Sequence, residues 1–102
     1  MHVTVTAYTS SIQETDSTPF TTASNKRVRK GFIAVSRDLL TLIPLGTKVY
    51  VNTGLEEYDG WYKVEDVMHK RKRNWIDIWF SDLRSALEFG IRKGSLILQM
   101  AE

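Results

Sequence analysis

The chain has 102 residues, a formal net charge of +2 and no cysteine, and 42% of its residues are hydrophobic. This length and composition are typical of one soluble globular domain, which we expect to span residues 1–102. Without cysteine there is no disulfide framework and no thiolate metal site, and with only two histidines we predict neither a metal nor a cofactor.

The first residues, MHVTVTAYT, contain neither a charged start nor an apolar run, so we predict no signal peptide. No stretch of the sequence approaches the ~18 apolar residues of a membrane span, and we expect no membrane partner. As encoded, the protein is expected in the cytoplasm or on a larger particle, or in the cell envelope if it is cut from a longer exported protein.

Short β-rich segments recur along the whole chain. Alternating apolar positions, or short apolar runs, predict six strands, at residues 2–8, 32–36, 47–52, 61–68, 75–80 and 94–100. Between the strands we predict a long polar loop at residues 9–31 and a turn or single helical turn at residues 37–46. A hairpin loop with an Asp-Gly turn is predicted at residues 53–60, and a basic connection at residues 69–74.

One helix is predicted after the fifth strand. Ser81 is the expected N-cap, and Gly90 is the expected stop after Phe89. Asp82 suits the first turn, because an acidic side chain is stabilised at the positive end of the helix dipole. Six short strands, one helix and long crossing loops predict a small closed barrel, although the periodicity alone leaves a sandwich open.

The order of several short motifs resembles that of a known domain family. The matching stretches are TAY (6–8), TTAS (21–24), GFIAVSRDLL (31–40), IPLGTKVYV (43–51), VEDVM (64–68), IDIWF (76–80) and ALEFG (86–90). Together they resemble the 3D domain, named for three aspartates, which is related to the catalytic part of membrane-bound lytic transglycosylase A. Rare lipoprotein A and the first domain of expansins are more distant relatives. The resemblance implies an all-β fold with one short helix, a six-stranded double-psi β-barrel.

Asp66 and Asp77 are the most specific element of this resemblance. They are eleven residues apart across an expected β-hairpin, which is the spacing of the paired aspartates in the family. Asp77 stands where the family has its catalytic acid, and alternation places it on one strand face with Trp75 and Trp79. From the residues alone, Asp77 could instead cap the following helix or be an ordinary hydrogen-bonded residue at a strand end, and Asp66 could be a surface residue. The resemblance makes both aspartates candidate catalytic residues.

The activity that the resemblance implies is cleavage of peptidoglycan glycan strands, between N-acetylmuramic acid and N-acetylglucosamine, without consuming water. One carboxylic acid protonates the glycosidic oxygen, and the resulting carboxylate takes the proton of the C6 hydroxyl that attacks C1, so that one residue is both acid and base. The pKa of such an acid has to rise by roughly two to three units above ~3.9, through apolar neighbours and a second carboxylate nearby.

Two positions depart from the family pattern, and both are expected around the groove. The first family aspartate usually follows IAV, and here Ser36 takes that place, with Asp38 two residues on as an open substitute. A glycine loop often follows the second aspartate, and here the loop contains the basic residues 69–73, which would oppose a raised carboxyl pKa if they faced the groove. The predicted enzyme therefore has a rival, a non-catalytic wall-binding or structural module such as a phage component.

Six further residues are candidates for binding the glycan, namely Tyr8, Asp16, Thr22, Ser24, Trp75 and Trp79. The two tryptophan rings could stack on sugar faces, or they could complete a small core or a subunit contact. The two hydroxyls match groove positions of the family, or they bond their own backbone. Tyr8 either matches a family aromatic near the groove or is a core residue. Asp16 lies either at the rim of the groove or in a turn.

Two basic clusters, residues 26–30 and 69–73, could contact phosphates. The small net charge and the lack of a base-reading motif favour solvated loops, so we do not expect nucleic acid as a partner. The same positive charge could attract anionic wall polymers such as stem peptides and teichoic acids. Nothing in the sequence specifies an oligomeric state.

Overall fold

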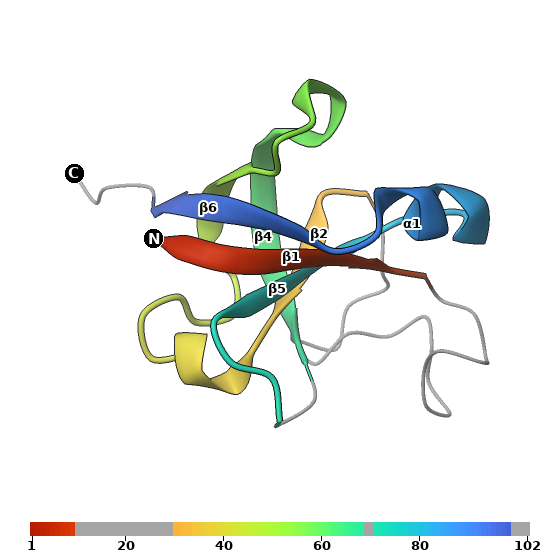
Figure 1. The fold of residues 1–102 in the computed structure, drawn as a ribbon. Coiled ribbons are helices and arrows are strands. Elements are labelled where there is room, and N and C mark those ends of the chain that lie inside the picture. The colour runs from red at the N-terminus through yellow and green to blue at the C-terminus, as the bar shows by residue number, and fades with distance from the viewer. Residues whose placement is uncertain (10–29, 69–70, 99–102) are drawn as a thin grey trace.

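The chain folds into a closed barrel of six strands with one α-helix. The computed structural model describes residues 1–9, 30–68 and 71–98 (Figure 1). In chain order, the elements are β1 (His2–Tyr8), β2 (Phe32–Val35), the 3-10 turn η1 (Arg37–Leu39), β3 (Lys48–Asn52), the 3-10 turn η2 (Glu56–Tyr58), β4 (Gly60–Val67), β5 (Trp75–Trp79), α1 (Leu83–Phe89) and β6 (Arg92–Leu98). The six predicted strands are confirmed, with ends that differ by one or two residues.

The order of the strands around the barrel is β1-β5-β2-β4-β3-β6, and β6 closes the barrel onto β1. The pairs β1–β5 and β2–β4 are parallel, whereas the other neighbours are antiparallel. The expected hairpin between β4 and β5 is wrong, because β2 lies between these two strands and pairs with both. A local pattern of two strands and a short connection cannot reveal that an earlier strand is inserted between them.

The predicted hairpin between β3 and β4 is confirmed by their antiparallel pairing. Its loop is held by the side chain of Asp59, whose Oδ1 accepts hydrogen bonds from the backbone N–H of Thr53 at 2.5 Å and from its hydroxyl at 2.7 Å. Gly60 then begins β4 with a φ of 156°, a value that favours glycine. The Asp-Gly pair therefore closes the loop through both its side chain and its backbone.

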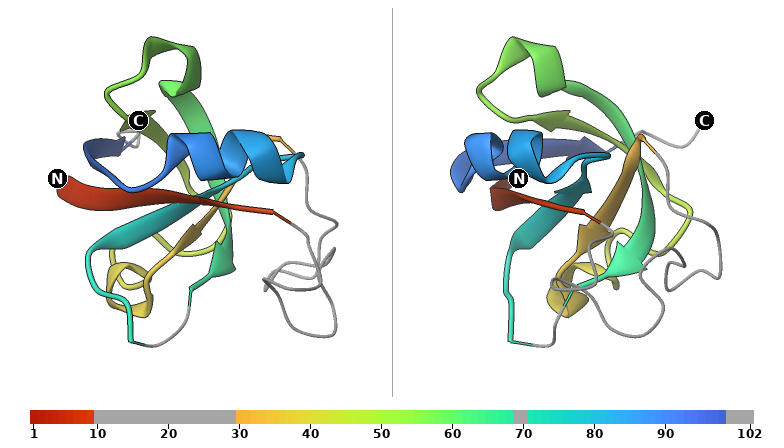
Figure 2. Two further views of the ribbon diagram at one scale, coloured as in Figure 1. Left: turned by 45° about the vertical axis from the view of Figure 1, so that its right-hand side comes forward. Right: turned by 90° about the vertical axis from the view of Figure 1, so that its right-hand side faces the viewer.

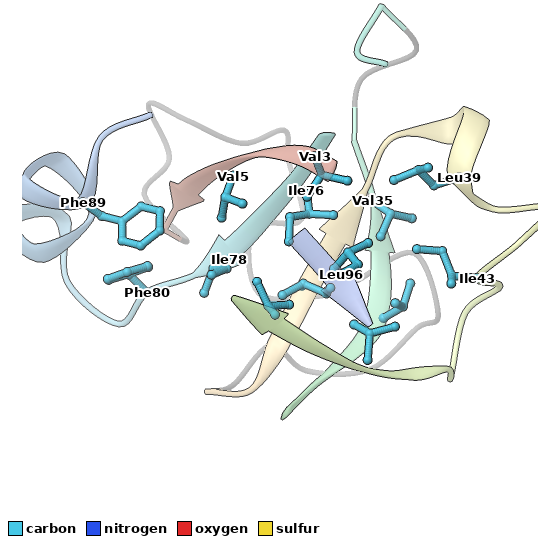
Figure 3. Close-up of a cluster of buried hydrophobic side chains, with 14 of the residues drawn as sticks. Val3, Val5, Val35, Leu39, Ile43, Ile76, Ile78, Phe80, Phe89 and Leu96 are labelled. Carbon is cyan, nitrogen blue, oxygen red and sulfur yellow. The ribbon is translucent and has the colours of Figure 1, made fainter. Parts of the chain in front are cut away.

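Aliphatic side chains from all six strands fill the inside of the barrel (Figure 3). Val5, Ile33, Val49, Val64 and Ile76 have no exposed surface. Each side chain of this size contributes about 1.5 to 3 kcal/mol relative to an exposed position. Because every second residue of a strand faces this core, the residues between them face outward.

Three aromatic rings close the end of the barrel at α1. The ring of Phe80 lies 5.3 Å from that of Phe89 and 5.1 Å from that of Tyr58, measured between ring centroids. Phe80 and Phe89 are both buried, and α1 packs beside β1 (Figure 2). The short helix is therefore held by its tertiary contacts, since a helix of this length is not stable alone.

The N-cap of α1 is Asp82 and not Ser81. The carboxylate of Asp82 accepts a hydrogen bond from the backbone N–H of Ser85 at 2.9 Å, and its own backbone is extended. This hydrogen bond also holds the pKa of Asp82 below its usual range. Both residues have side chains that can cap, so the sequence alone does not decide between adjacent candidates. The predicted stop is confirmed, because Gly90 follows the helix with a φ of 68°.

We predict that Gly94→Ala destabilises the barrel where β6 passes between β1 and β3. A Cβ at this position would lie 2.5 Å from the carbonyl oxygen of Asn52 and 2.8 Å from Cγ2 of Val5, so the backbone of β3 has to shift. We expect a loss of about 1 to 3 kcal/mol in the free energy of unfolding, and a fall in Tm of roughly 4 to 8 °C for each kcal/mol. Thermal unfolding monitored by circular dichroism measures it.

The matched control is Ser95→Ala at the next residue of β6, which should change the Tm by less than about 4 °C. Equal losses in the two variants would contradict the steric explanation.

Candidate functional site

Four adjacent strands carry one row of side chains on the outer face of the barrel. Asp77 on β5 is directly opposite Thr6 on β1 and Ala34 on β2, and Ala34 is in turn opposite Asp66 on β4. Directly paired residues share one face of a sheet. The two isoleucines that flank Asp77 are buried in the core, so the row points outward. The outward position of Asp77 agrees with the predicted alternation.

Asp66 and Asp77 lie two strands apart, with Ala34 between them. Neighbouring strands are about 4.8 Å apart, so the two Cα atoms are separated by roughly 10 Å. Ala34 is only 4% exposed, so the surface between the two aspartates is covered. At this separation of the backbone, each carboxylate lies within the electrostatic reach of the other.

A register shift on β4 places a second carboxylate beside Asp66. Ile33 on β2 pairs with Val64 on β4, but the next residue of β2, Ala34, pairs with Asp66. Glu65 is therefore the extra residue of a β-bulge. Glu65 is only 1% exposed, and its Oε2 lies 3.5 Å from Nζ of Lys63, which places its side chain on the outer face. Glu65 was not predicted as a site residue, because nothing in the residues VEDV indicates a bulge.

A hydrogen-bonded chain positions the carboxyl group of Asp77. The indole Nε1 of Trp75 donates to the hydroxyl of Thr6 at 2.8 Å, and this hydroxyl donates to Oδ1 of Asp77 at 2.9 Å. All three side chains are half-buried on the outer face of β1 and β5. These two hydrogen bonds determine the orientation of the carboxyl group, and they show that Asp77 does not cap α1. Thr6 was part of a matched motif, but its role was not predicted.

Tyr8 lies at the same site and does not belong to the core cluster. Burial of its hydroxyl raises the pKa of Tyr8, and the carboxylates of Asp66 and Asp77 raise it further. The hydroxyl oxygen is buried and has no hydrogen-bond partner within the described part of the chain. Tyr8 therefore remains neutral and presents an O–H group within electrostatic reach of both aspartates.

The two tryptophans on either side of Asp77 have different surroundings. Trp75 carries Lys72 above its ring, with Nζ 4.1 Å from the ring centroid, and uses its N–H to hold Thr6. Trp79 lines a cleft of about 370 Å³ between α1 and the start of β4, which Tyr62 and Ser81 also line. Neither ring belongs to the core cluster. Trp75 therefore supports the carboxyl group, and Trp79 is the ring that lines the cleft.

Ser36 and Asp38 act together where β5 begins. Ser36 is fully buried, and its hydroxyl accepts a hydrogen bond from the backbone N–H of Trp75 at 3.0 Å. Oδ2 of Asp38 accepts one from the N–H of Asn74, which has a φ of 51°, at 3.0 Å. The Ser36 hydroxyl and this N–H hold the pKa of Asp38 below its usual range, and Arg73 lowers it further. Asp38 is thus committed to the turn before β5.

Part of the predicted site lies outside the described residues. This applies to Asp16, Thr22 and Ser24, and to most of the two basic clusters. Of the described basic residues after β4, Lys72 lies over Trp75 and Arg73 acts on Asp38. The structure therefore brings together Tyr8, both aspartates and the two tryptophans, and it adds side chains that were not predicted, Thr6 and Glu65.

No protein-family model and no curated protein sequence matches the chain. Solved structures do match. An expansin from Clavibacter michiganensis superimposes with a TM-score of 0.66 at 18% sequence identity over 99% of this chain. An aspartate-to-asparagine variant of a Clavibacter michiganensis expansin, in complex with cellohexaose, superimposes with a TM-score of 0.58 at 16% sequence identity over 97% of this chain. MltA from E. coli superimposes with 0.51 at 16% identity over 84% of this chain.

These matches confirm the predicted fold, a six-stranded double-psi β-barrel. The chain spans half the length of the expansins and 30% of the length of MltA. At these identities the likeness extends to the fold alone.

Within residues 1–9, 30–68 and 71–98, no helix is long and apolar enough to cross a membrane. The same ranges contain no group of three or more histidine, aspartate or glutamate side chains that could hold a metal ion.

We predict that Thr6→Val disconnects Asp77 from Trp75. The valine has the same shape but neither donates to the carboxylate nor accepts from the indole N–H, so two polar groups lose a partner. We expect a loss of about 1 to 3 kcal/mol in the free energy of unfolding, measured by urea denaturation. The control is Thr4→Val, two residues earlier on the same face, which should change stability by less than about 0.5 kcal/mol. Equal losses of stability in the two variants would show that the hydrogen bonds of Thr6 contribute nothing specific.

We predict that Asp38→Asn weakens the dependence of stability on acidic pH. The pKa of Asp38 is lowered in the folded state, so its charge stabilises the fold above the unfolded value of ~3.9, and this stabilisation is lost as the pH falls through the folded value. Asparagine cannot ionise, and the variant should lose less stability than wild type between pH 5 and pH 2.5. Urea unfolding across this range measures it, with the exposed Glu56→Gln as control. An unchanged slope would contradict the prediction.

Proposed function

We propose that this chain is a single domain that acts on cell-wall glycan polymers, and that it cleaves peptidoglycan as a lytic transglycosylase. The observation that carries the proposal is the place of Asp77, at the middle of β5, facing outward between Trp75 and Trp79 and in one row with Asp66. The expansin bound to cellohexaose and MltA share the fold, and they support a glycan polymer as the partner.

In the proposed reaction, Asp77 is first an acid and then a base. Its carboxylic proton passes to the glycosidic oxygen while the bond from that oxygen to C1 breaks. The resulting carboxylate then takes the proton of the muramoyl C6 hydroxyl, whose oxygen bonds to C1 and closes a 1,6-anhydro ring. The hydrogen bond from Thr6 to Oδ1 orients the carboxyl group for this transfer.

The neighbours of Asp77 have supporting roles in this proposal. Asp66 disfavours a second negative charge across the row, and this helps Asp77 to hold its proton. Tyr8 is neutral, and its buried O–H can donate to a neighbouring carboxylate. Trp79, at the open cleft, offers a flat apolar ring for the face of a pyranose.

One observation favours the non-catalytic alternative. The family aspartate after IAV is replaced by Ser36, which is buried and bonded to the backbone of Trp75, and Asp38 is occupied with Asn74. Neither residue restores a third carboxyl group to the row of Asp66 and Asp77. A barrel that binds wall glycan without cleaving it is therefore the second candidate function.

The experiment is a digest of purified peptidoglycan with wild type and with Asp77→Asn, and products are separated by mass. Asparagine still accepts the hydrogen bond from Thr6 but carries no proton to transfer, so the fold is kept. We expect 1,6-anhydro-muropeptides from the wild type and an initial rate lower by about 100-fold or more from the variant.

Glu56→Gln is the matched control, because it removes one exposed carboxylate of η2 and should leave the rate unchanged. If neither the wild type nor any variant releases products while all three proteins sediment with the sacculi, the catalytic proposal is wrong and the binding candidate holds. If wild type neither releases products nor sediments with sacculi, both candidate functions are wrong.

A further inference from the structure

A second site lies next to the aspartate row, on the outer face of β2, β4 and β3. It is a depression of about 670 Å³, lined by Lys30, Gly31, Phe32, Lys48, Trp61, Tyr62 and Lys63. Its described lining contains three lysines and no carboxylate. The depression is therefore positively charged, in contrast to the carboxylates of the neighbouring row.

Two of the lysines are directly opposite each other. Lys48 on β3 pairs with Lys63 on β4, and like charges in such a pair destabilise a sheet. Lys63 is relieved by Glu65, which lies 3.5 Å away on the side of the aspartates. Lys48 forms no ion pair with any acidic side chain of the described residues. The arrangement places the ammonium group of Lys48 in the lining of the depression at a cost to the stability of the fold. An anionic ligand would offset this cost.

The side chain of Trp61 is the largest apolar surface that the depression presents. It is 58% exposed although it lies within β4. Its ring is fixed from one side by Tyr50, which is directly opposite on β3, with centroids 5.6 Å apart and planes at 85°. A tryptophan held in this way exposes a rigid flat face at little cost in conformational entropy, which suits the apolar face of a sugar ring.

The depression and the aspartate row lie on the same strand, β4. Lys63 and Asp66 are three residues apart on this strand and both face outward, a distance of roughly 10 Å. Phe32 is opposite Lys63 and is two residues from Ala34, the centre of the row. A glycan that crosses Asp77 can therefore extend over β4 to Trp61 within a few sugar residues.

We infer that this depression is an accessory subsite for an acidic sugar, in which Trp61 stacks on the ring and Lys48, with Lys30, binds a carboxylate or phosphate substituent. The inference rests on the proposed function for the polymer that reaches the subsite, but not on cleavage by Asp77. Because both lysines are exposed, their attraction is screened by salt, and the stacking contact is not.

The test is a nuclear magnetic resonance titration that follows the indole N–H signals, with the signal of Trp61 assigned from its absence in Trp61→Phe. Two anionic probes, soluble muropeptides with free carboxylates and purified teichoic acid with phosphodiesters, distinguish the possible sources of the charge. Chitotetraose is the neutral probe. We expect at least one anionic probe to shift the Trp61 signal, with an affinity about 10-fold weaker in 300 mM than in 50 mM salt.

The variants separate charge at the subsite from charge in general. Lys48→Gln should weaken the anionic probe about 5- to 10-fold and leave chitotetraose unchanged. Trp61→Ala should remove binding of both, as followed by the backbone amide signals of β3 and β4. Lys93→Gln, an equal change of charge at an exposed residue of β6, should have no effect. Equal losses in Lys48→Gln and Lys93→Gln, or an anionic probe that leaves the Trp61 signal in place, would overturn the inference.

The same titration of Asp77→Asn distinguishes this inference from the proposed function. Unchanged binding by a variant that no longer cleaves peptidoglycan supports both. If wild type does not cleave but its Trp61 signal still shifts, the subsite holds and the catalytic proposal fails. If wild type cleaves and its Trp61 signal does not shift, the subsite is wrong and the catalytic proposal holds.

Discussion

The pairing of β2 with two strands from the later part of the chain is the constraint on which the site depends. This strand has only four residues, all of them buried, and it joins β5 on one side and β4 on the other. Its Ala34 is opposite Asp77 and Asp66 at once, so a single residue determines how far apart the two carboxylates lie. The short strand therefore closes the barrel and sets the geometry of the acidic row with the same backbone.

The parts of the fold that depend on local sequence could be predicted. Alternation located the six strands, and the strand faces followed from it, including the outward position of Asp77 with both tryptophans. The non-local pairing was predicted wrongly, because a separation of eleven positions between Asp66 and Asp77 resembles a hairpin when β2, some thirty residues earlier, is not considered. Adjacent residues with similar chemistry were also indistinguishable, as Ser81 and Asp82 show, since either side chain can cap a helix.

The hydrogen bonds that support the site were not visible in the sequence for a related reason. Thr6 joins Trp75 to Asp77 only because β1 and β5 are parallel neighbours, and their residues are about seventy positions apart. Ser36 was identified as a departure from the family pattern, but its role in holding the start of β5 needed the structure. Glu65 faces the site because one extra residue on β4 turns two consecutive acidic side chains to the same side.

Charges of opposite sign lie next to each other on the outer face of the barrel. Glu65 and Asp66 follow Lys63 along β4, and Lys63 is opposite Lys48 on β3. The ion pair between Lys63 and Glu65 marks the boundary between the two groups. A neutral polymer could cross such a surface in either sense. A glycan with acidic substituents is repelled at the aspartates and attracted at the lysines, so its uncharged linkage is the part that can approach Asp77. The cleavage that we propose at Asp77 and the acidic sugar that we infer at the lysines are therefore compatible on one small barrel, because the two kinds of charge occupy different parts of the same outer face.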